Sequence, residues 1–147
     1  MAAINAGKVI TSGLAAGLVL NVIDFASNMY IIGSRMKLEL DTVNPSLWAS
    51  LNDPGNIAYF VAIDFALGVM IVWLYAAIRP RFGAGPATAI KAGLFVWIVA
   101  SLMWSFFYFM GLTAFSSFVL TGVISLVNFV GAAWVGGWLY AEPDSTA

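Results

Sequence analysis

Cysteine and histidine are both absent from this chain of 147 residues. Without cysteine the chain forms no disulfide bond, carries no thiolate nucleophile and holds neither an iron–sulfur cluster nor a thiolate zinc site. Without histidine it lacks the commonest general base and the usual axial ligand of haem. The sequence therefore excludes a Ser-His-Asp triad, a zinc-protease motif and a histidine-ligated haem, and it predicts no cofactor and no metal centre.

Charge is scarce as well. Only 9% of the residues are charged and 62% are hydrophobic, whereas ordinary globular domains carry about 25% charged and about 45–50% apolar residues. Six basic and seven acidic side chains cannot cover the surface of a soluble domain of this length. The composition predicts an integral membrane protein whose partner is the lipid bilayer. A net charge of −1 offers no basic patch, so no nucleic-acid partner is expected.

Long apolar segments are present in place of charge. A helix crosses the hydrocarbon core with about 20 mostly apolar residues. The blocks do not alternate apolar and polar residues, which argues against a closed barrel. We therefore predict an all-α, four-helix transmembrane bundle that forms one domain over residues 1–147. Its helices run roughly over 8–32, 57–78, 87–110 and 113–140, with an outer loop at 33–56 and a tight turn at Gly111.

Basic residues are distributed unevenly between the two ends of these helices. The end with the amino terminus carries Lys8, Arg79, Arg81 and Lys91, and the other end carries Arg35 and Lys37. Because basic residues favour the cytoplasmic side, both termini are expected in the cytoplasm. The acidic tail with Glu142 and Asp144 contributes little to this rule.

The connections contain helix-boundary signals. Pro80 is expected to end the second helix, and Pro86 suits the first turn of the third. In the outer loop, Asn44-Pro45 predicts a cap and a short helix that includes Trp48 and lies in the membrane interface. Residues 35–41 alternate charged and apolar side chains, which hints at an extended segment.

Two aspartates, Asp24 and Asp64, lie inside predicted spans. An aspartate near the centre of a membrane helix costs about 2.5–3.5 kcal/mol on insertion scales. At a rise of about 1.5 Å per residue both lie roughly 10–12 Å below the outer surface, so antiparallel neighbouring helices would bring them together. Two carboxylates in this environment would share a proton, or they would bind a metal ion or a cationic ligand.

Small and polar residues form a stripe on the first helix, within about 80°, and another on the fourth, within about 100°. Helix contacts in lipid use such stripes, because small residues let backbones approach and polar groups bond across. The candidate polar site consists of Asp24, Asp64, Asn21, Asn28, Ser101, Thr121 and Asn128. The candidate packing residues are Gly13, Gly17, Ala132 and Gly136.

Aromatic residues are expected to serve the membrane interface and the packing of the bundle. An interfacial belt is predicted at the cytoplasmic ends, from Trp73, Tyr75, Trp134, Trp138 and Tyr140. Trp97 and Trp104 share a face of the third helix. Lipid contact or packing explains this pair better than a pigment or a quinone.

A resemblance to a known family rests on the stretch Val72-Trp73-Leu74-Tyr75-Ala76-Ala77-Ile78-Arg79-Pro80-Arg81-Phe82-Gly83, followed by Gly85-Pro86. It resembles a segment of small four-helix bacterial membrane proteins of unassigned function, and the glycine-rich first helix is similar too. The resemblance implies a multi-pass protein of the bacterial inner membrane. It implies no activity and transfers no functional residues.

Two classes of function follow from these features. The first is a structural or accessory membrane subunit, in a homo-oligomer or a larger membrane complex, whose polar stripes serve assembly. The alternative is a small transporter or channel for protons or cations that uses Asp24 and Asp64. A membrane enzyme ranks third, because only carboxylates and hydroxyls are present as catalytic groups.

Overall fold

The computed structural model describes residues 4–140, and most of them are helical. Four helices are long and apolar enough to cross a membrane, as a multi-pass integral membrane protein requires. The predicted all-α bundle is therefore confirmed, whereas the acidic tail with Glu142 and Asp144 lies outside the described residues. The elements are α1 (Ala6–Ser27), the π-helix η1 (Asn28–Ile32), α2 (Gly33–Val43), α3 (Ser46–Leu51), α4 (Pro54–Phe82), α5 (Pro86–Phe109) and α6 (Phe115–Leu139).

The first helix is longer than the sequence indicated. α1, η1 and α2 follow one another without a break and form a helix of 38 residues, Ala6–Val43. The expectation of a loop from residue 33 and of an extended segment at 35–41 is therefore wrong. The alternating charges fit a helix that has left the hydrocarbon, because Lys37 and Asp41, one turn apart, form an ion pair.

The wide turn of η1 depends on glycine. The backbone N–H of Gly33 bonds back to the carbonyl of Asn28, five residues earlier. A Cβ atom on Gly33 would lie only 2.3 Å from this carbonyl oxygen. A residue with a side chain would therefore disturb the turn that links α1 to α2.

Side-chain caps mark the starts of α3 and α4. The Oδ1 atom of Asn44 accepts a hydrogen bond of 3.0 Å from the backbone N–H of Ser46, so the predicted cap is present. The Oδ1 atom of Asp53 accepts one of 2.9 Å from Gly55, and Pro54 occupies the first turn of α4.

The prediction that Pro80 ends the second helix is wrong. α4 continues to Phe82, and the N–H of Gly83 donates to the carbonyl of Arg79 at 2.9 Å. Pro80 lies in the last turn of α4. The hydrogen bond that its missing N–H cannot make is therefore lost only at the end of the helix. The chain leaves at Gly83, whose φ of 83° favours glycine. Pro86 begins α5, as predicted.

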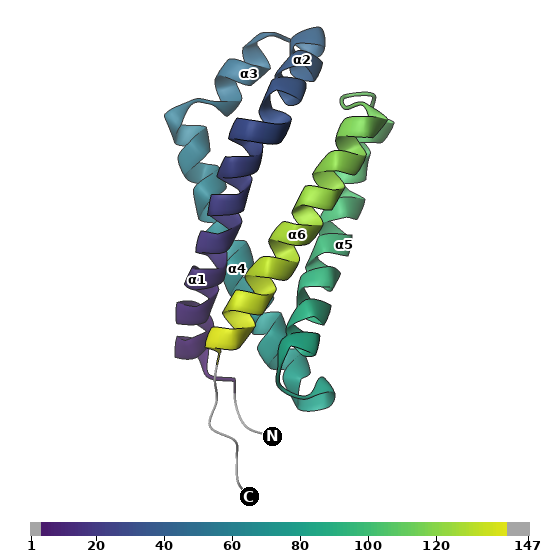
Figure 1. The fold of residues 1–147 in the computed structure, drawn as a ribbon. Helices are drawn as coiled ribbons and strands as arrows, with labels where there is room; N and C mark the ends of the chain where they lie inside the picture. Colours follow the sequence, from purple (N-terminus) through teal and green to yellow (C-terminus); the bar gives the residue numbers. More distant parts are fainter. Residues whose placement is uncertain (1–3, 141–147) are drawn as a thin grey trace, which may run out of the picture.

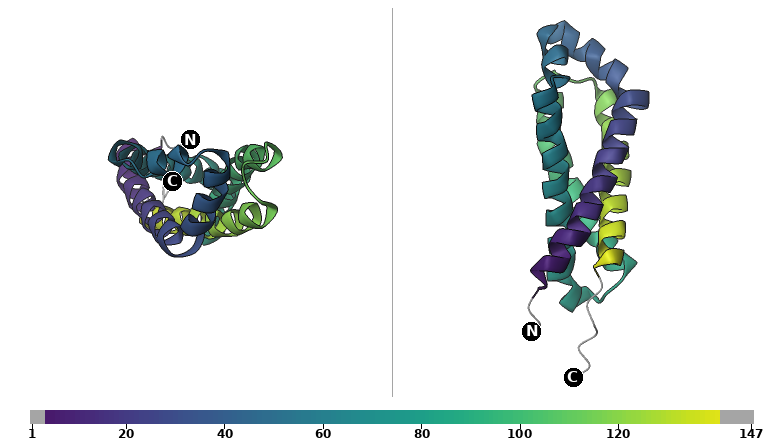
Figure 2. Two further views of the ribbon diagram at one scale, coloured as in Figure 1. Left: turned by 90° about the horizontal axis from the view of Figure 1, so that it is seen from above. Right: turned by 90° about the vertical axis from the view of Figure 1, so that its left-hand side faces the viewer.

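The four long helices run alternately in opposite directions, and α1 and α4 cross as an X (Figure 1). Beyond the crossing these two helices move apart, and α2 and α3 bridge the space between them (Figure 2). We call the end of the bundle that carries α2 and α3 the outer end, and the opposite end the inner end. α5 and α6 form the second antiparallel pair, joined by a turn in which Gly111 has a φ of 74°. α1 begins and α6 ends at the inner end.

Glycines let α1 and α4 touch through their backbones at the crossing. A Cβ atom on Gly68 would lie 2.3 Å from the backbone nitrogen of Gly17, and one on Gly17 would lie 2.6 Å from the Cα atom of Phe65. A Cβ atom on Gly13 would lie 2.5 Å from the Cα atom of Val69. Non-bonded carbon atoms prefer about 3.5–4.0 Å, so larger residues would push the helices apart.

Small residues also join the second helix pair to the first. A Cβ atom on Gly136 of α6 would lie 3.0 Å from the Cβ atom of Ala16 in α1, and Ala132, one turn earlier, is fully buried. On α5, a Cβ atom at Gly93 would lie 2.9 Å from the Cβ atom of Ala133. The inner half of the bundle is therefore closed by close helix contacts.

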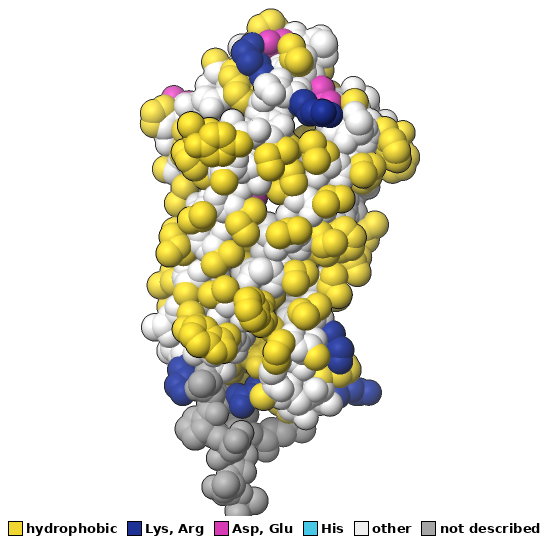
Figure 3. Space-filling model, in the orientation of Figure 1, with side chains coloured by type: hydrophobic (Ala, Val, Ile, Leu, Met, Phe, Trp, Pro, Cys, Tyr) yellow, Lys and Arg dark blue, Asp and Glu magenta, His cyan; other side chains and the backbone are white. Residues whose placement is uncertain are grey.

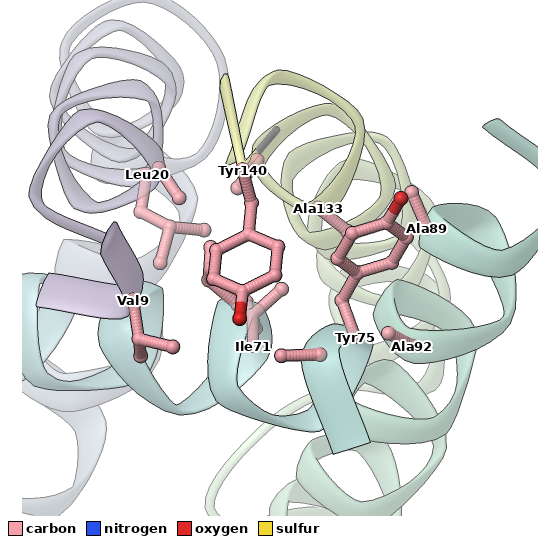
Figure 4. Packing of buried hydrophobic residues seen from close by; sticks show 12 residues of the cluster. Val9, Leu20, Ile71, Tyr75, Ala89, Ala92, Ala133 and Tyr140 are labelled. Atoms are coloured by element: carbon pink, nitrogen blue, oxygen red, sulfur yellow. The ribbon is translucent and has the colours of Figure 1, made fainter. Parts of the chain in front are cut away.

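Two tyrosines belong to the core at the inner end (Figure 4). Tyr75 and Tyr140 are each 2% exposed, and their rings meet nearly at right angles with centroids 6.1 Å apart. Their hydroxyl oxygens accept hydrogen bonds from the backbone N–H of Gly85 at 3.1 Å and of Asn5 at 3.3 Å. The expected interfacial belt is therefore wrong for these two tyrosines. It agrees with the exposure of the other three members, Trp73, Trp134 and Trp138.

Large apolar side chains cover the molecule between its two ends, and charged side chains gather at the ends (Figure 3). α5 presents some of the most exposed of them, with Phe106 66% exposed and Phe109 80% exposed. An apolar surface of this kind matches the hydrocarbon core of a bilayer rather than water.

We expect the glycines at the crossing to control stability. Gly68→Ala should lower the free energy of unfolding by about 1–3 kcal/mol, the cost typical of overpacking, and Gly17→Leu should be more severe. The matched control is Gly131→Ala in α6, where a Cβ atom meets nothing within 4 Å; it should be neutral or slightly stabilising. Thermal unfolding in detergent measures all three, and equal effects at Gly68 and Gly131 would contradict the packing described.

Candidate intramembrane polar site

Polar side chains gather beyond the crossing, where α1 and α4 separate. A Cβ atom on Gly17 would lie 3.1 Å from the carbonyl oxygen of Asp64, which fixes the register of the two helices. Asp24 stands seven residues beyond Gly17, on the order of 10 Å farther along α1. The two aspartates are thus offset along the bundle. The sequence had indicated that they lie at one level, and this expectation is wrong.

Asp24 contacts α6 through an asparagine. The Nδ2 atom of Asn128 donates a hydrogen bond of 2.7 Å to Oδ1 of Asp24 and a longer one, of 3.4 Å, to the carbonyl of Leu20. Asn128 is 2% exposed, and its own Oδ1 atom is buried without a partner among the described residues. A hydrogen bond to a carboxylate is stronger than one between neutral groups, so this contact ties α1 to α6.

The other three asparagine and aspartate residues of the candidate site, Asn21, Asp64 and Asn28, differ in their contacts. The Nδ2 atom of Asn21 donates to the carbonyl of Gly17 at 2.9 Å and to that of Val61 in α4 at 3.4 Å, so it links the two crossing helices. Asp64 is half-buried, and within the described part of the chain its carboxyl shares no hydrogen bond with Asp24. Asn28 belongs to η1 and is exposed.

The polar residues of α5 and α6 do not join the aspartates. The Oγ atom of Ser101 is buried and has no hydrogen-bond partner among residues 4–140. Thr121 lines a cavity of about 20 Å³ at the outer end, together with Arg35, Glu39 and Trp104. This volume suffices for about one water molecule. The structure therefore brings together Asp24 and Asn128, but not Asp64, Ser101 or Thr121.

The tryptophans of α5 serve packing. The Nε1 atom of Trp97 donates to the carbonyl of Gly122 in α6 at 2.9 Å. The ring of Trp104 packs on that of Phe107 with centroids 4.6 Å apart, and its Nε1 atom is buried without a partner in the described residues. These contacts agree with the expectation of bundle packing.

A contact at the outer end was not predicted from the sequence. The carboxylate of Glu39 in α2 accepts a hydrogen bond of 2.7 Å from the Thr113 hydroxyl and one of 3.2 Å from the backbone N–H of Ala114, just before α6 begins. A carboxylate here caps the helix and complements its dipole. The missed signal was the lack of a capping side chain at Ala114, which leaves this role to a residue from another element.

Positive charge is missing from the surroundings of the aspartates. The apolar stretches 9–34, 54–78 and 92–140 include no lysine and no arginine. Among the described residues, no three histidine, cysteine, aspartate or glutamate side chains come together as a metal site. The carboxyls of Asp24 and Asp64 therefore depend on amide groups, on protons or on cations from outside the chain.

A double-mutant cycle tests the bond between α1 and α6. Asp24→Ala, Asn128→Ala and the double variant should show a coupling energy of about 0.6 kcal/mol, and at most about 1.7 kcal/mol, in the free energy of unfolding, since these are the mean and the maximum for polar contacts measured in a membrane protein. As a control, Asp24→Ala should be additive with Thr11→Ala, because the Thr11 hydroxyl bonds only within its own helix. A coupling energy near zero for the first pair would contradict the contact.

Comparisons with protein-family models, curated proteins and solved structures find no match to this chain. The resemblance of residues 72–83 to small bacterial membrane proteins stays a prediction. The functional argument therefore rests on the polar contacts themselves.

Proposed function

We propose that this protein is a structural or accessory subunit of a membrane assembly, either a homo-oligomer or a larger complex. Its place would be the bacterial inner membrane, with both termini in the cytoplasm. The excess of basic residues at the inner end supports this orientation, since Lys8, Arg79, Arg81 and Lys91 all belong to it.

The observation that carries the proposal is the use of polar side chains as links between helices. Asn128 links α6 to α1, Asn21 links α1 to α4, and Trp97 links α5 to α6. Membrane helices associate through small residues and hydrogen bonds of this kind, because lipid supplies no hydrophobic drive between them. A bundle built in this way suits a protein that holds a fixed shape beside its partners.

Assembly can be measured directly. Native mass spectrometry of the protein released from lipid nanodiscs should show species heavier than the 15.7 kDa chain. Asp24→Asn should leave the assembly intact, because an amide oxygen still accepts the hydrogen bond from Asn128. If the chain is found only as a monomer, both in nanodiscs and in mild detergent extracts of its native membrane, the subunit role is wrong.

One observation favours the alternative, a transporter or channel for protons or cations. Asp24 is exposed beyond the crossing of α1 and α4, Asp64 is half-buried beside the crossing, and the apolar stretches 9–34, 54–78 and 92–140 contain no basic residue to balance them. Ionisable groups inside a membrane commonly mark the path of an ion or proton. The same residues that hold the bundle together would then also bind the transported ion.

Flux in proteoliposomes separates the two functions. Under the alternative, Asp24→Asn and Asp64→Asn should abolish proton or cation flux while the bundle stays folded. Asp41→Asn is the matched control, because its carboxylate pairs with Lys37 at the outer end, away from the aspartate pair. Under the subunit role, neither the unmodified protein nor the variants should show flux above that of empty liposomes.

A further inference from the structure

The side-chain oxygen of Asn128 is a buried acceptor whose partner the described chain does not supply. Asn128 is 2% exposed and lies between α1 and α6. Its Nδ2 atom is fully used, by Asp24 and by the carbonyl of Leu20, whereas its Oδ1 atom has no partner. Buried polar atoms are nearly always paired, with protein, water or an ion, so an unpaired one points to a bound species.

The position of this oxygen follows from the geometry of the amide. Oδ1 and Nδ2 of one amide group are about 2.3 Å apart, and Nδ2 lies 2.7 Å from Oδ1 of Asp24. The unpaired oxygen is therefore within about 5 Å of a carboxylate oxygen. Oxygen ligands stand about 2.3–2.6 Å from a cation of the size of calcium, so an ion beside the amide group, off the line through Nδ2, can contact both oxygens.

Charge favours a cation over a neutral occupant. The carboxylate of Asp24 is the acidic group that Asn128 contacts directly. Residues 9–34, 54–78 and 92–140 contain no basic side chain to neutralise it. A cation would satisfy the buried oxygen and this carboxylate together, because carboxylate and amide oxygens are the ligands that hard cations prefer.

We propose that Asp24 and Asn128 bind a small, hard monovalent cation of the size of sodium between α1 and α6. A divalent ion fits less well, because the described residues contain no group of three acidic or histidine side chains to hold it. The proposal goes beyond the subunit role, since a bound cation strengthens the α1–α6 contact whether or not it crosses the membrane.

Binding is measured at equilibrium on the purified protein in detergent, with choline chloride replacing sodium chloride at constant ionic strength. Radioactive sodium should bind saturably, with one site per chain, and sodium should raise the temperature of unfolding over the same concentration range. Lithium and potassium compete in separate arms, and calcium serves as the divalent arm. No gradient is present, so a lack of flux or a monomeric state would leave this result unaffected.

The variants identify the ligands. Asp24→Asn keeps an oxygen that accepts from Asn128 but removes the charge, and Asn128→Leu removes the amide at similar volume; each should weaken sodium binding at least tenfold. Asp41→Asn, at the ion pair with Lys37, should bind as the unmodified protein does. The absence of saturable sodium binding to the unmodified protein up to about 0.15 M salt would overturn the proposal. Unchanged binding by Asp24→Asn, or displacement by calcium at far lower concentration than by sodium, would also overturn it.

Discussion

The backbone contact between α1 and α4 is the constraint on which the rest of the bundle depends. Gly17 and Gly68 meet with no room for a side chain, so the two helices cross at one fixed point and diverge outward from it. The divergence leaves Asp24 beyond the reach of α4, and its hydrogen bond goes to Asn128 on α6 instead. The position of the polar site is therefore set by residues that have no polar side chain at all.

The same constraint explains the unequal halves of the molecule. Toward the inner end, alanine and glycine of α6 follow the crossing and keep the helices close, as at Ala132 and Gly136. Toward the outer end the helices are held by hydrogen bonds between side chains instead. The clearest is the one that the Thr113 hydroxyl donates to the Glu39 carboxylate of α2. Polar groups in lipid are tolerated where neighbouring helices supply their hydrogen-bond partners. In this bundle such groups lie in the wider, outer half.

The four membrane-spanning helices were predictable from the sequence, because the thickness of the bilayer sets the length of the apolar run that each of them needs. The register of the helices was not predictable, since Gly68 is a lone glycine in an apolar segment and its contact with Gly17 depends on the crossing. Asp24 and Asp64 were therefore expected at one level and are offset. Glu39 was missed because a charge alternation at 35–41 looks alike in a strand and in a solvated helix. Tyr75 and Tyr140 show that position along a helix does not reveal which way a side chain points.

The π-turn at Asn28–Ile32 sets the angular phase of everything that follows it in the first helix. The turn holds one extra residue, so the side chains beyond it are rotated by about 100° around the helix axis relative to those of an uninterrupted α-helix. Glu39 lies seven residues after this turn and bonds to the residues just before α6. The membrane part of the helix presents its small residues to α4, and the outer part presents a carboxylate to the start of α6. The direction in which Glu39 points therefore depends on the wide turn as well as on its place in the sequence.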